Sequence, residues 1–108
     1  MAFDVLIQNG TVVDGTGAAR YGADLGIVAG RIAAIGALHD RDAHLTIDAA
    51  GKIVTPGFID IHQHSDFTPL VNRPCESAVR QGITTAVIGN CGHGCAPLYD
   101  PDLIRMVV

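Results

Sequence analysis

Two histidines stand one residue apart in "GFIDIHQHSD" (57–66), directly after an apolar run. Side chains alternate between the two faces of a strand, so Asp60, His62 and His64 are predicted to share one face near the strand's C-terminal end. Two imidazoles at this spacing can reach one divalent cation at about 2.0–2.1 Å. The alternative is that His62 and His64 are exposed or capping residues, and spacing alone does not decide between these interpretations.

A cysteine follows the next apolar run of the chain. Cys91 ends "ITTAVIGNC" (83–91) and is surrounded by glycines, which allow close backbone approach to a ligand. The C-terminal ends of successive parallel strands lie on the same side of a sheet, where active sites collect. A Cys91 thiolate could therefore complete a ligand set with His62 and His64. The alternative is a buried cysteine that packs as a small apolar residue.

Other polar residues near these three are weaker candidates. Asp60 and Asp66 flank the histidines and could orient them, or they could be solvated residues at a strand end. His93 and Cys95, in "CGHGC", suggest an extra metal site, but a C-x-x-x-C with a central histidine is not an established zinc spacing. Surface positions or no special role are expected for the remaining histidines and cysteine, which are His39, His44 and Cys75.

The second half of the chain must position the candidate ligands. Residues 58–62 are predicted as an apolar strand, 74–82 as a short helix that begins near a proline and stops at a glycine, and 83–91 as a strand buried on both faces. Asp100 and Pro101 are typical of a helix start and predict a helix through "DLIRMVV". This strand–helix–strand–helix order predicts a parallel sheet, and the chain reads as cut off within the last helix.

The first 55 residues are predicted to form short strands separated by turns. Asn9-Gly10 is a strong turn signal after the apolar "FDVLIQNG", and residues 14–22 read as a glycine-rich loop. Residues 25–35 are typical of a β-hairpin with a tight turn at Ala29-Gly30. "HLTIDAAGKIVTPG" (44–57) adds two short strands. Such close spacing favours a small sandwich or half-barrel.

The composition is that of a globular protein. The chain has 108 residues, 48% hydrophobic and 17% charged, with a net charge of −4. A single lysine and scattered arginines argue against non-specific nucleic-acid binding. No apolar run approaches the roughly 18 residues of a membrane-spanning helix, and the N-terminus lacks a signal-peptide pattern. Three cysteines without a secretion signal favour reduced thiols and a cytoplasmic location.

These motifs resemble those of a known family. "VTPGFIDIHQHSD" is similar to the first barrel strand of the amidohydrolase superfamily of metal-dependent hydrolases. "QGITTAVIGNCGHGCAPL" resembles, more narrowly, the second strand of its N-acyl-D-amino-acid deacylase (D-aminoacylase) branch. The opening "VLIQNGTVVDGTG" and the strands after it resemble the β-strands that flank the barrel in that superfamily. The resemblance covers nearly the whole chain.

The resemblance implies a site and a reaction. His62 and His64 match the first-strand histidine pair, and Cys91 matches the metal-ligating cysteine of the branch. One or two Zn²⁺ ions would polarise the amide carbonyl and lower the pKa of a bound water. The implied substrate is a small N-acyl-D-amino acid. A general-base aspartate from the last strand, and histidines from strands five and six, are not found in these 108 residues.

The resulting fold prediction is α/β, with a flanking β-sandwich segment over residues 1–55 and the first two strands of a (β/α)₈ barrel over residues 56–108. A full barrel takes about 250 residues, so the chain is expected to be an N-terminal fragment without activity of its own. Two alternatives stay open. One is a hydrolase of cyclic amides, like dihydroorotases and hydantoinases, which Cys91 disfavours. The other is a non-catalytic remnant that binds at most a metal or a partner.

Overall fold

The computed structural model describes residues 2–94, 97, 100 and 102. These residues have a mixed, β-rich α/β architecture that divides into two compact units, residues 1–56 and residues 57–108. No helix among the described residues is long and apolar enough to cross a membrane. Of the helix expected over "DLIRMVV" (102–108), only residue 102 is among the described residues.

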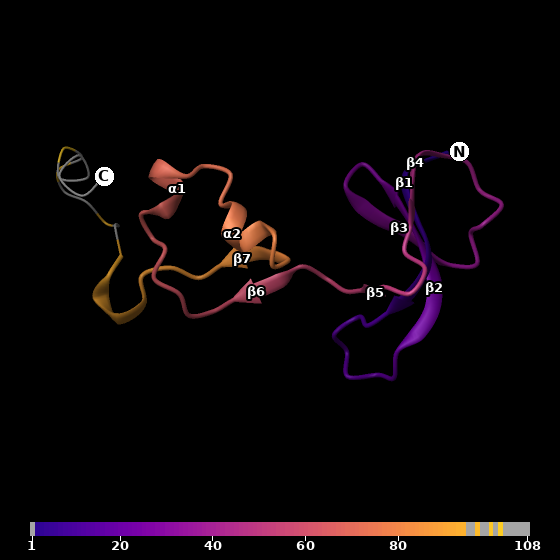
Figure 1. Cartoon of the computed structure of the whole chain (residues 1–108), viewed down its shortest axis with the longest axis horizontal. Helices are drawn as coiled ribbons and strands as arrows, with labels where there is room; N and C mark the ends of the chain where they lie inside the picture. Colours follow the sequence, from indigo (N-terminus) through magenta and orange to yellow (C-terminus); the bar gives the residue numbers. More distant parts are fainter. Residues whose placement is uncertain (1, 95–96, 98–99, 101, 103–108) are drawn as a thin grey trace. The chain divides into compact units, whose positions relative to one another are not determined.

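The first unit is built around its first strand. β1 (Phe3–Val12) pairs antiparallel with β2 (Tyr21–Val28), which pairs antiparallel with β3 (Arg31–Gly36). Along its other edge, β1 pairs in parallel with β4 (Ala43–Asp48) and further on with β5 (Ile53–Val54). The result is one five-stranded sheet (Figure 1). Residues 2–56 thus make a single sheet, and the second layer of the expected sandwich is not formed by them.

The predicted hairpin is confirmed. β2 and β3 are joined by Ala29 and Gly30, whose φ angles of 51° and 73° are both left-handed. A two-residue turn with two positive φ angles matches the twist of the strands it joins. Asp4 on the neighbouring strand supports the turn, because its Oδ2 accepts a hydrogen bond from the Ala29 N–H at 2.6 Å.

The predicted turn at Asn9-Gly10 is wrong. β1 continues through these residues, and the pairing with β2 shifts register between Ile7 and Gly10, as in a β-bulge. Asn9 has a φ of 63°, so its tolerance of the left-handed region serves a bulge here. The Asn9 N–H donates to Asp24 Oδ1 at 2.9 Å, and the Asn9 side-chain amide donates to Asp48 Oδ1 at 3.0 Å. Side chains from two neighbouring strands therefore hold the bulge.

The first unit has a small apolar core. Its buried hydrophobic side chains come from β1, from β2 and from the residue directly after β4: Phe3, Leu6, Val12, Leu25 and Ala49. Gly26 allows the Phe3 ring to lie directly against the β2 backbone, because a Cβ at that position would overlap the ring. Burial of these side chains is the main stabilising contribution to the unit.

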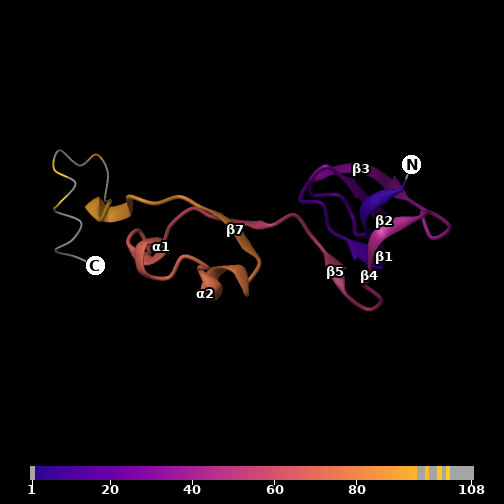
Figure 2. The same ribbon diagram turned by 90° about the horizontal axis from the view of Figure 1, so that it is seen from above.

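The second unit is a small parallel βαβ arrangement, as predicted. β6 (Phe58–Asp60) pairs in parallel with β7 (Ile83–Ala86), and two one-turn helices lie between them in sequence, α1 (Thr68–Val71) and α2 (Glu76–Val79). α2 contacts β7. Both helices lie on the same side of the strand pair in Figure 1 and in Figure 2.

Two expectations for the second unit need correction. All three predicted elements are shorter than expected: β6 ends at Asp60 and not at residue 62, β7 ends at Ala86 and not at residue 91, and the helix expected over 74–82 spans only Glu76–Val79. β7 is not buried on both faces, since Thr84, Thr85 and Ala86 are exposed, and Val87 and Ile88 after it are 47% and 50% exposed. A strand is buried on both faces only when elements pack on each of them, and β7 is contacted by β6 and α2 alone among the described elements.

Candidate metal centre

His62 and His64 lie in the segment after β6, beyond the strand that was expected to carry them. The alternation of strand side chains therefore does not place them. A local turn follows the end of β6. In this turn the Asp60 Oδ1 accepts a hydrogen bond from the His62 N–H at 3.2 Å, two residues further on. The two imidazoles nevertheless converge, with ring centroids 5.4 Å apart and ring planes at 83°.

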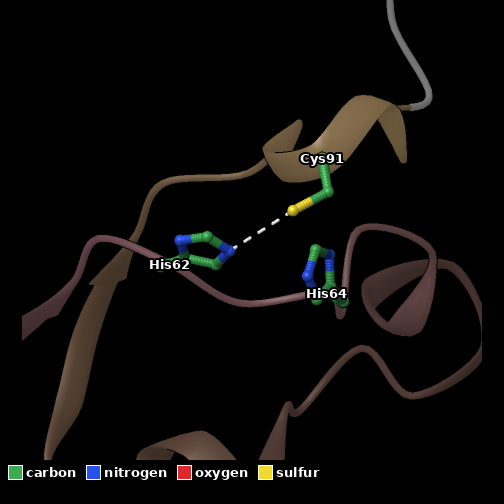
Figure 3. A group of neighbouring side chains, drawn as sticks. All are labelled: His62, His64 and Cys91. Carbon is green, nitrogen blue, oxygen red and sulfur yellow. Dashed lines mark hydrogen bonds between the residues drawn. The ribbon is translucent and has the colours of Figure 1, made fainter.

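Cys91 lies on a short 3₁₀ turn (Asn90–Gly92) that follows β7. Its φ of 54° is in the left-handed region, which is sparsely populated by residues other than glycine, asparagine and aspartate. The Cys91 Sγ points toward the two histidines and lies 3.6 Å from His62 Nε2 (Figure 3). The turn therefore brings the thiol to the imidazoles across 29 residues of sequence.

The three predicted ligands form one group. One donor atom from each of His62, His64 and Cys91 lies within 4.8 Å of the others, and all three residues are exposed. Zinc binds histidine nitrogen at about 2.0–2.1 Å and cysteine sulfur at about 2.3 Å in tetrahedral geometry, so donors on one ion are about 3.5 Å apart. Small side-chain rotations would bring the group to that spacing. Nitrogen and thiolate donors are also the set that zinc prefers, so these residues fit the metal.

Hydrogen bonds tie together the two loops that carry the group. Asp66 Oδ1 accepts a hydrogen bond from the Gly89 N–H at 2.6 Å, and Asp66 is only 4% exposed. The Asn90 side-chain amide donates to the carbonyls of Val87 at 2.9 Å and Gln63 at 3.4 Å. Asp60 and Asp66, for which orienting the histidines was one of two interpretations, thus contact the backbone of the two loops.

Asn90 is a positioning residue that the sequence interpretation did not single out. Its place directly before Cys91, between a strand end and glycines, was the available signal. A short amide side chain in such a loop commonly bonds nearby backbone groups. Here it bonds one carbonyl on its own loop and one on the loop of the histidines.

The remaining candidates are placed as follows. The His93 ring lies against the His64 ring, with centroids 5.1 Å apart. Cys95 lies outside the described residues. His39 and His44 are exposed in the first unit, as expected, and His39 pairs with Asp40 at 3.2 Å. Cys75 is the N-cap residue directly before α2 and has a left-handed φ of 46°, and its Sγ lies 3.5 Å from the Asn72 carbonyl oxygen.

Known proteins with similar sequences and structures are amidohydrolases. The model of the amidohydrolase family matches residues 45–107. D-aminoacylase from Alcaligenes xylosoxydans xylosoxydans is 48% identical over 96 residues, which are 89% of this chain and 20% of that protein. The crystal structure of N-acyl-D-glutamate deacylase from Bordetella bronchiseptica, complexed with zinc and a phosphonate inhibitor, superposes with a TM-score of 0.86 at 49% identity, over 90% of this chain and 20% of that one. L-hydantoinase from Arthrobacter aurescens gives a TM-score of 0.65 at 38% identity, over 78% and 20% of the two chains.

The family match covers more than half of the sequence, so this chain belongs to the amidohydrolase family. Its fold matches part of the deacylase structure, and the chain spans about a fifth of the length of the relatives it matches.

Proposed function

We propose that this chain is the N-terminal part of a zinc-dependent amidohydrolase that hydrolyses N-acyl-D-amino acids to a carboxylate and the free D-amino acid. Residues 1–55 would be a flanking β-sandwich segment, and residues 56–108 the first two strands of a (β/α)₈ barrel. The observation that carries the proposal is the group of two imidazoles and one thiol whose donor atoms lie within 4.8 Å of one another.

The parallel strands explain why the group forms where it does. β6 and β7 run in the same direction, so the loops after them leave the same edge of the sheet. His62 and His64 come from the first of these loops and Cys91 from the second. In this position the three side chains would hold zinc at the open end of a barrel, where active sites of this architecture lie.

Zinc bound there would supply a Lewis acid that polarises the amide carbonyl and acidifies the attacking water. The chain's own residues would determine the position of the zinc ion. Asp66 and Asn90 hold the two loops together through backbone groups, which keeps the thiol beside the imidazoles. Because Asp66 is buried, its hydrogen bond to Gly89 is little exposed to competing water.

A cyclic-amide hydrolase is the second candidate, since a hydantoinase structure is also similar to this chain. Two observations favour the acyclic substrate. The TM-score is 0.86 for the N-acyl-D-glutamate deacylase and 0.65 for the L-hydantoinase. Cys91 also supplies a thiol beside the histidine pair, as the resemblance to the deacylase branch implies.

The test is a hydrolysis assay on the protein encoded by the complete reading frame that contains this sequence. Release of free amino acid is measured from N-acetyl-D-amino acids, from their L counterparts and from hydantoins, with and without added zinc. We expect zinc-dependent turnover of the D substrates. His62→Ala and Cys91→Ala should each reduce it more than about 100-fold, because a lost ligand costs more than a lost outer contact. His44→Ala, at an exposed histidine, should leave it unchanged.

Turnover of hydantoins in place of N-acetyl-D-amino acids would replace this proposal with the cyclic-amide alternative. Full activity in His62→Ala would remove the proposed ligand set. The 108-residue chain alone is expected to show no amidase activity with zinc added, and zinc-dependent turnover by it would contradict the proposed division of the site.

A further inference from the structure

His93 is a histidine beside the candidate centre to which the proposed function gives no role. It follows Cys91 by two residues and caps the 3₁₀ turn, where its N–H donates to the Asn90 carbonyl at 3.0 Å. Its side chain is exposed, and its ring meets the His64 ring edge to face, at a centroid distance of 5.1 Å and an interplanar angle of 68°. Among the described residues, the three-donor group does not include His93, so an ion held by that group keeps a coordination position open for water.

The three candidate ligands are not held in the same way. The His62 N–H is bonded to Asp60 Oδ1, and His62 Nε2 lies 3.6 Å from the Cys91 Sγ. His64 stands beside this pair without such a bond (Figure 3). In the described part of the chain, the His64 ring contacts the rings of His62 and His93 and takes no part in a hydrogen bond. Ring contacts therefore set the orientation of the His64 imidazole.

An exposed imidazole must lose its rotational freedom before it can bind a metal. In most metal sites this freedom is restricted in advance, because the second ring nitrogen donates a hydrogen bond to a nearby acceptor. Two aromatic rings at a centroid distance of 4.5–7 Å attract each other in an edge-to-face arrangement, and the His64–His93 distance of 5.1 Å lies in this range. The His93 ring can thus restrict His64 where no hydrogen bond does so.

The backbone of His93 makes this contact useful to the whole group. His93 belongs to the same turn as Cys91, and its N–H bond to the Asn90 carbonyl closes that turn. His64 comes from the other loop, after β6. The ring contact therefore joins the loop of one candidate ligand to the turn of another, and it fixes the two donors relative to each other.

We propose that His93 is a positioning residue, whose ring holds the His64 imidazole in the orientation that binds the metal and whose nitrogen atoms do not bind it. This inference rests on the proposed function for the identity of the three ligands. A donor that is oriented before binding loses less conformational entropy when the ion arrives. His93 accordingly raises the affinity for the metal and leaves the water position free.

Three substitutions separate this role from a hydrogen bond to the substrate and from no role at all. His93→Phe keeps an aromatic ring against His64 and removes the nitrogen atoms. His93→Gln removes the ring and keeps a hydrogen-bond donor, and His93→Ala removes both. A positioning role of the ring predicts normal metal affinity in His93→Phe and weaker affinity in the other two variants.

The experiment uses the protein encoded by the complete reading frame, with its thiols reduced. Zinc affinity is measured by competition with a chromophoric chelator, and KM for an N-acetyl-D-amino acid is measured at saturating zinc. We expect zinc affinity about three- to tenfold lower in His93→Gln and His93→Ala, as the loss of one aromatic pair predicts, and unchanged in His93→Phe. KM should not change in any of the three variants, because His93 acts on His64 and not on the substrate.

Two controls accompany these measurements. His44→Gln, at an exposed histidine of the first unit, should bind zinc as the wild type does. The urea midpoint of each His93 variant should equal that of the wild type, because the His93 side chain is exposed and contributes little to the fold.

Equal zinc affinity in wild type and His93→Ala would overturn the inference. A loss in His93→Phe as large as that in His93→Ala would also overturn it, because the nitrogen atoms would then carry the effect. A raised KM with unchanged zinc affinity would assign His93 to the substrate instead. In each of these cases, loss of zinc binding in His62→Ala would leave the three-ligand centre of the proposed function standing, whereas a wild-type protein that binds no zinc would remove both.

Discussion

The two units of this chain are stabilised in different ways. In the first, the sheet buries apolar side chains from several strands, and Leu6 is only 1% exposed. In the second, Asp66 is the single buried residue among those described, and large apolar side chains such as Phe58 and Ile61 are exposed. One unit is held by apolar burial, and the other by strand pairing and by hydrogen bonds between loops.

The residues that contribute most to stability and the candidate metal ligands therefore lie in different units. The unit with the apolar core holds none of the candidate ligands, and the unit with the candidate ligands has no buried apolar side chain among its described residues. Complete burial of one large apolar side chain contributes about 1.5–3 kcal/mol to stability, whereas one hydrogen bond contributes a net of about 1 kcal/mol. Substitutions should therefore affect global unfolding mainly through the first unit and metal binding mainly through the second.

The largest effect is expected at the core of the first unit. Leu6→Ala should lower the free energy of unfolding by about 2–5 kcal/mol, because it leaves a cavity under the sheet. Urea denaturation followed by far-ultraviolet circular dichroism measures this. Leu45→Ala is the matched control, since Leu45 lies on the neighbouring strand and is 54% exposed. Equal losses in the two variants would show that the apolar core does not dominate the stability of this unit.

A close contact within the same core gives the next largest effect. An added methyl group at Gly26 would lie 2.5–2.7 Å from Cζ and Cδ1 of Phe3, so Gly26→Ala should cost about 1–3 kcal/mol. Gly22→Ala on the same strand meets no atom within 4 Å and should be close to neutral. Denaturation of both variants under identical conditions checks the pair. A stabilised Gly26→Ala protein would mean that the Phe3 ring moves aside without cost.

In the second unit, we expect the loop-to-loop hydrogen bond to matter for the metal centre. Asp66→Ala removes the acceptor of the Gly89 N–H and should lower zinc affinity about tenfold, as outer-shell losses do. Amide exchange at Gly89 should accelerate at the same time. The control is Asp40→Ala, because the side chain of Asp40 is 87% exposed. Faster exchange with unchanged affinity would limit Asp66 to a structural role.

The smallest effect is a pH dependence confined to the first unit. Hydrogen bonds from the backbone N–H groups of Asn9 and Leu38 lower the pKa of Asp24 in the folded state. This stabilisation is fully present above the ordinary pKa of an aspartate and is lost as the pH falls through the lowered value. The urea concentration at the midpoint of unfolding should therefore decrease when the pH is lowered below about 4. Asp24→Asn should reduce this decrease in the urea midpoint. Part of the decrease should remain, because the pKa of Asp48 is also lowered. An unchanged slope would contradict the role of Asp24.

The sequence determined much of this molecule through local physical chemistry. Residue types and spacing predicted the hairpin at Ala29-Gly30, since Gly30 adopts a left-handed φ without steric cost between two apolar runs. They also predicted the parallel βαβ arrangement of the second unit, because strands separated by a helical segment pair in parallel. The histidine pair and Cys91 stood out because imidazole and thiolate are the donors that zinc prefers.

Tertiary structure decided what local patterns do not encode. At Asn9 the same left-handed preference serves a bulge, because Asp24 and Asp48 on neighbouring strands bond it there. His62 and His64 converge after β6 has ended, so strand alternation does not bring them together. Cys91 reaches His62 across 29 residues because a 3₁₀ turn with a left-handed φ follows a parallel strand, and Asp66 bonds its loop to the loop of the histidines. Contacts between distant segments depend on how the whole unit folds, whereas turn chemistry and donor identity belong to each residue and its neighbours.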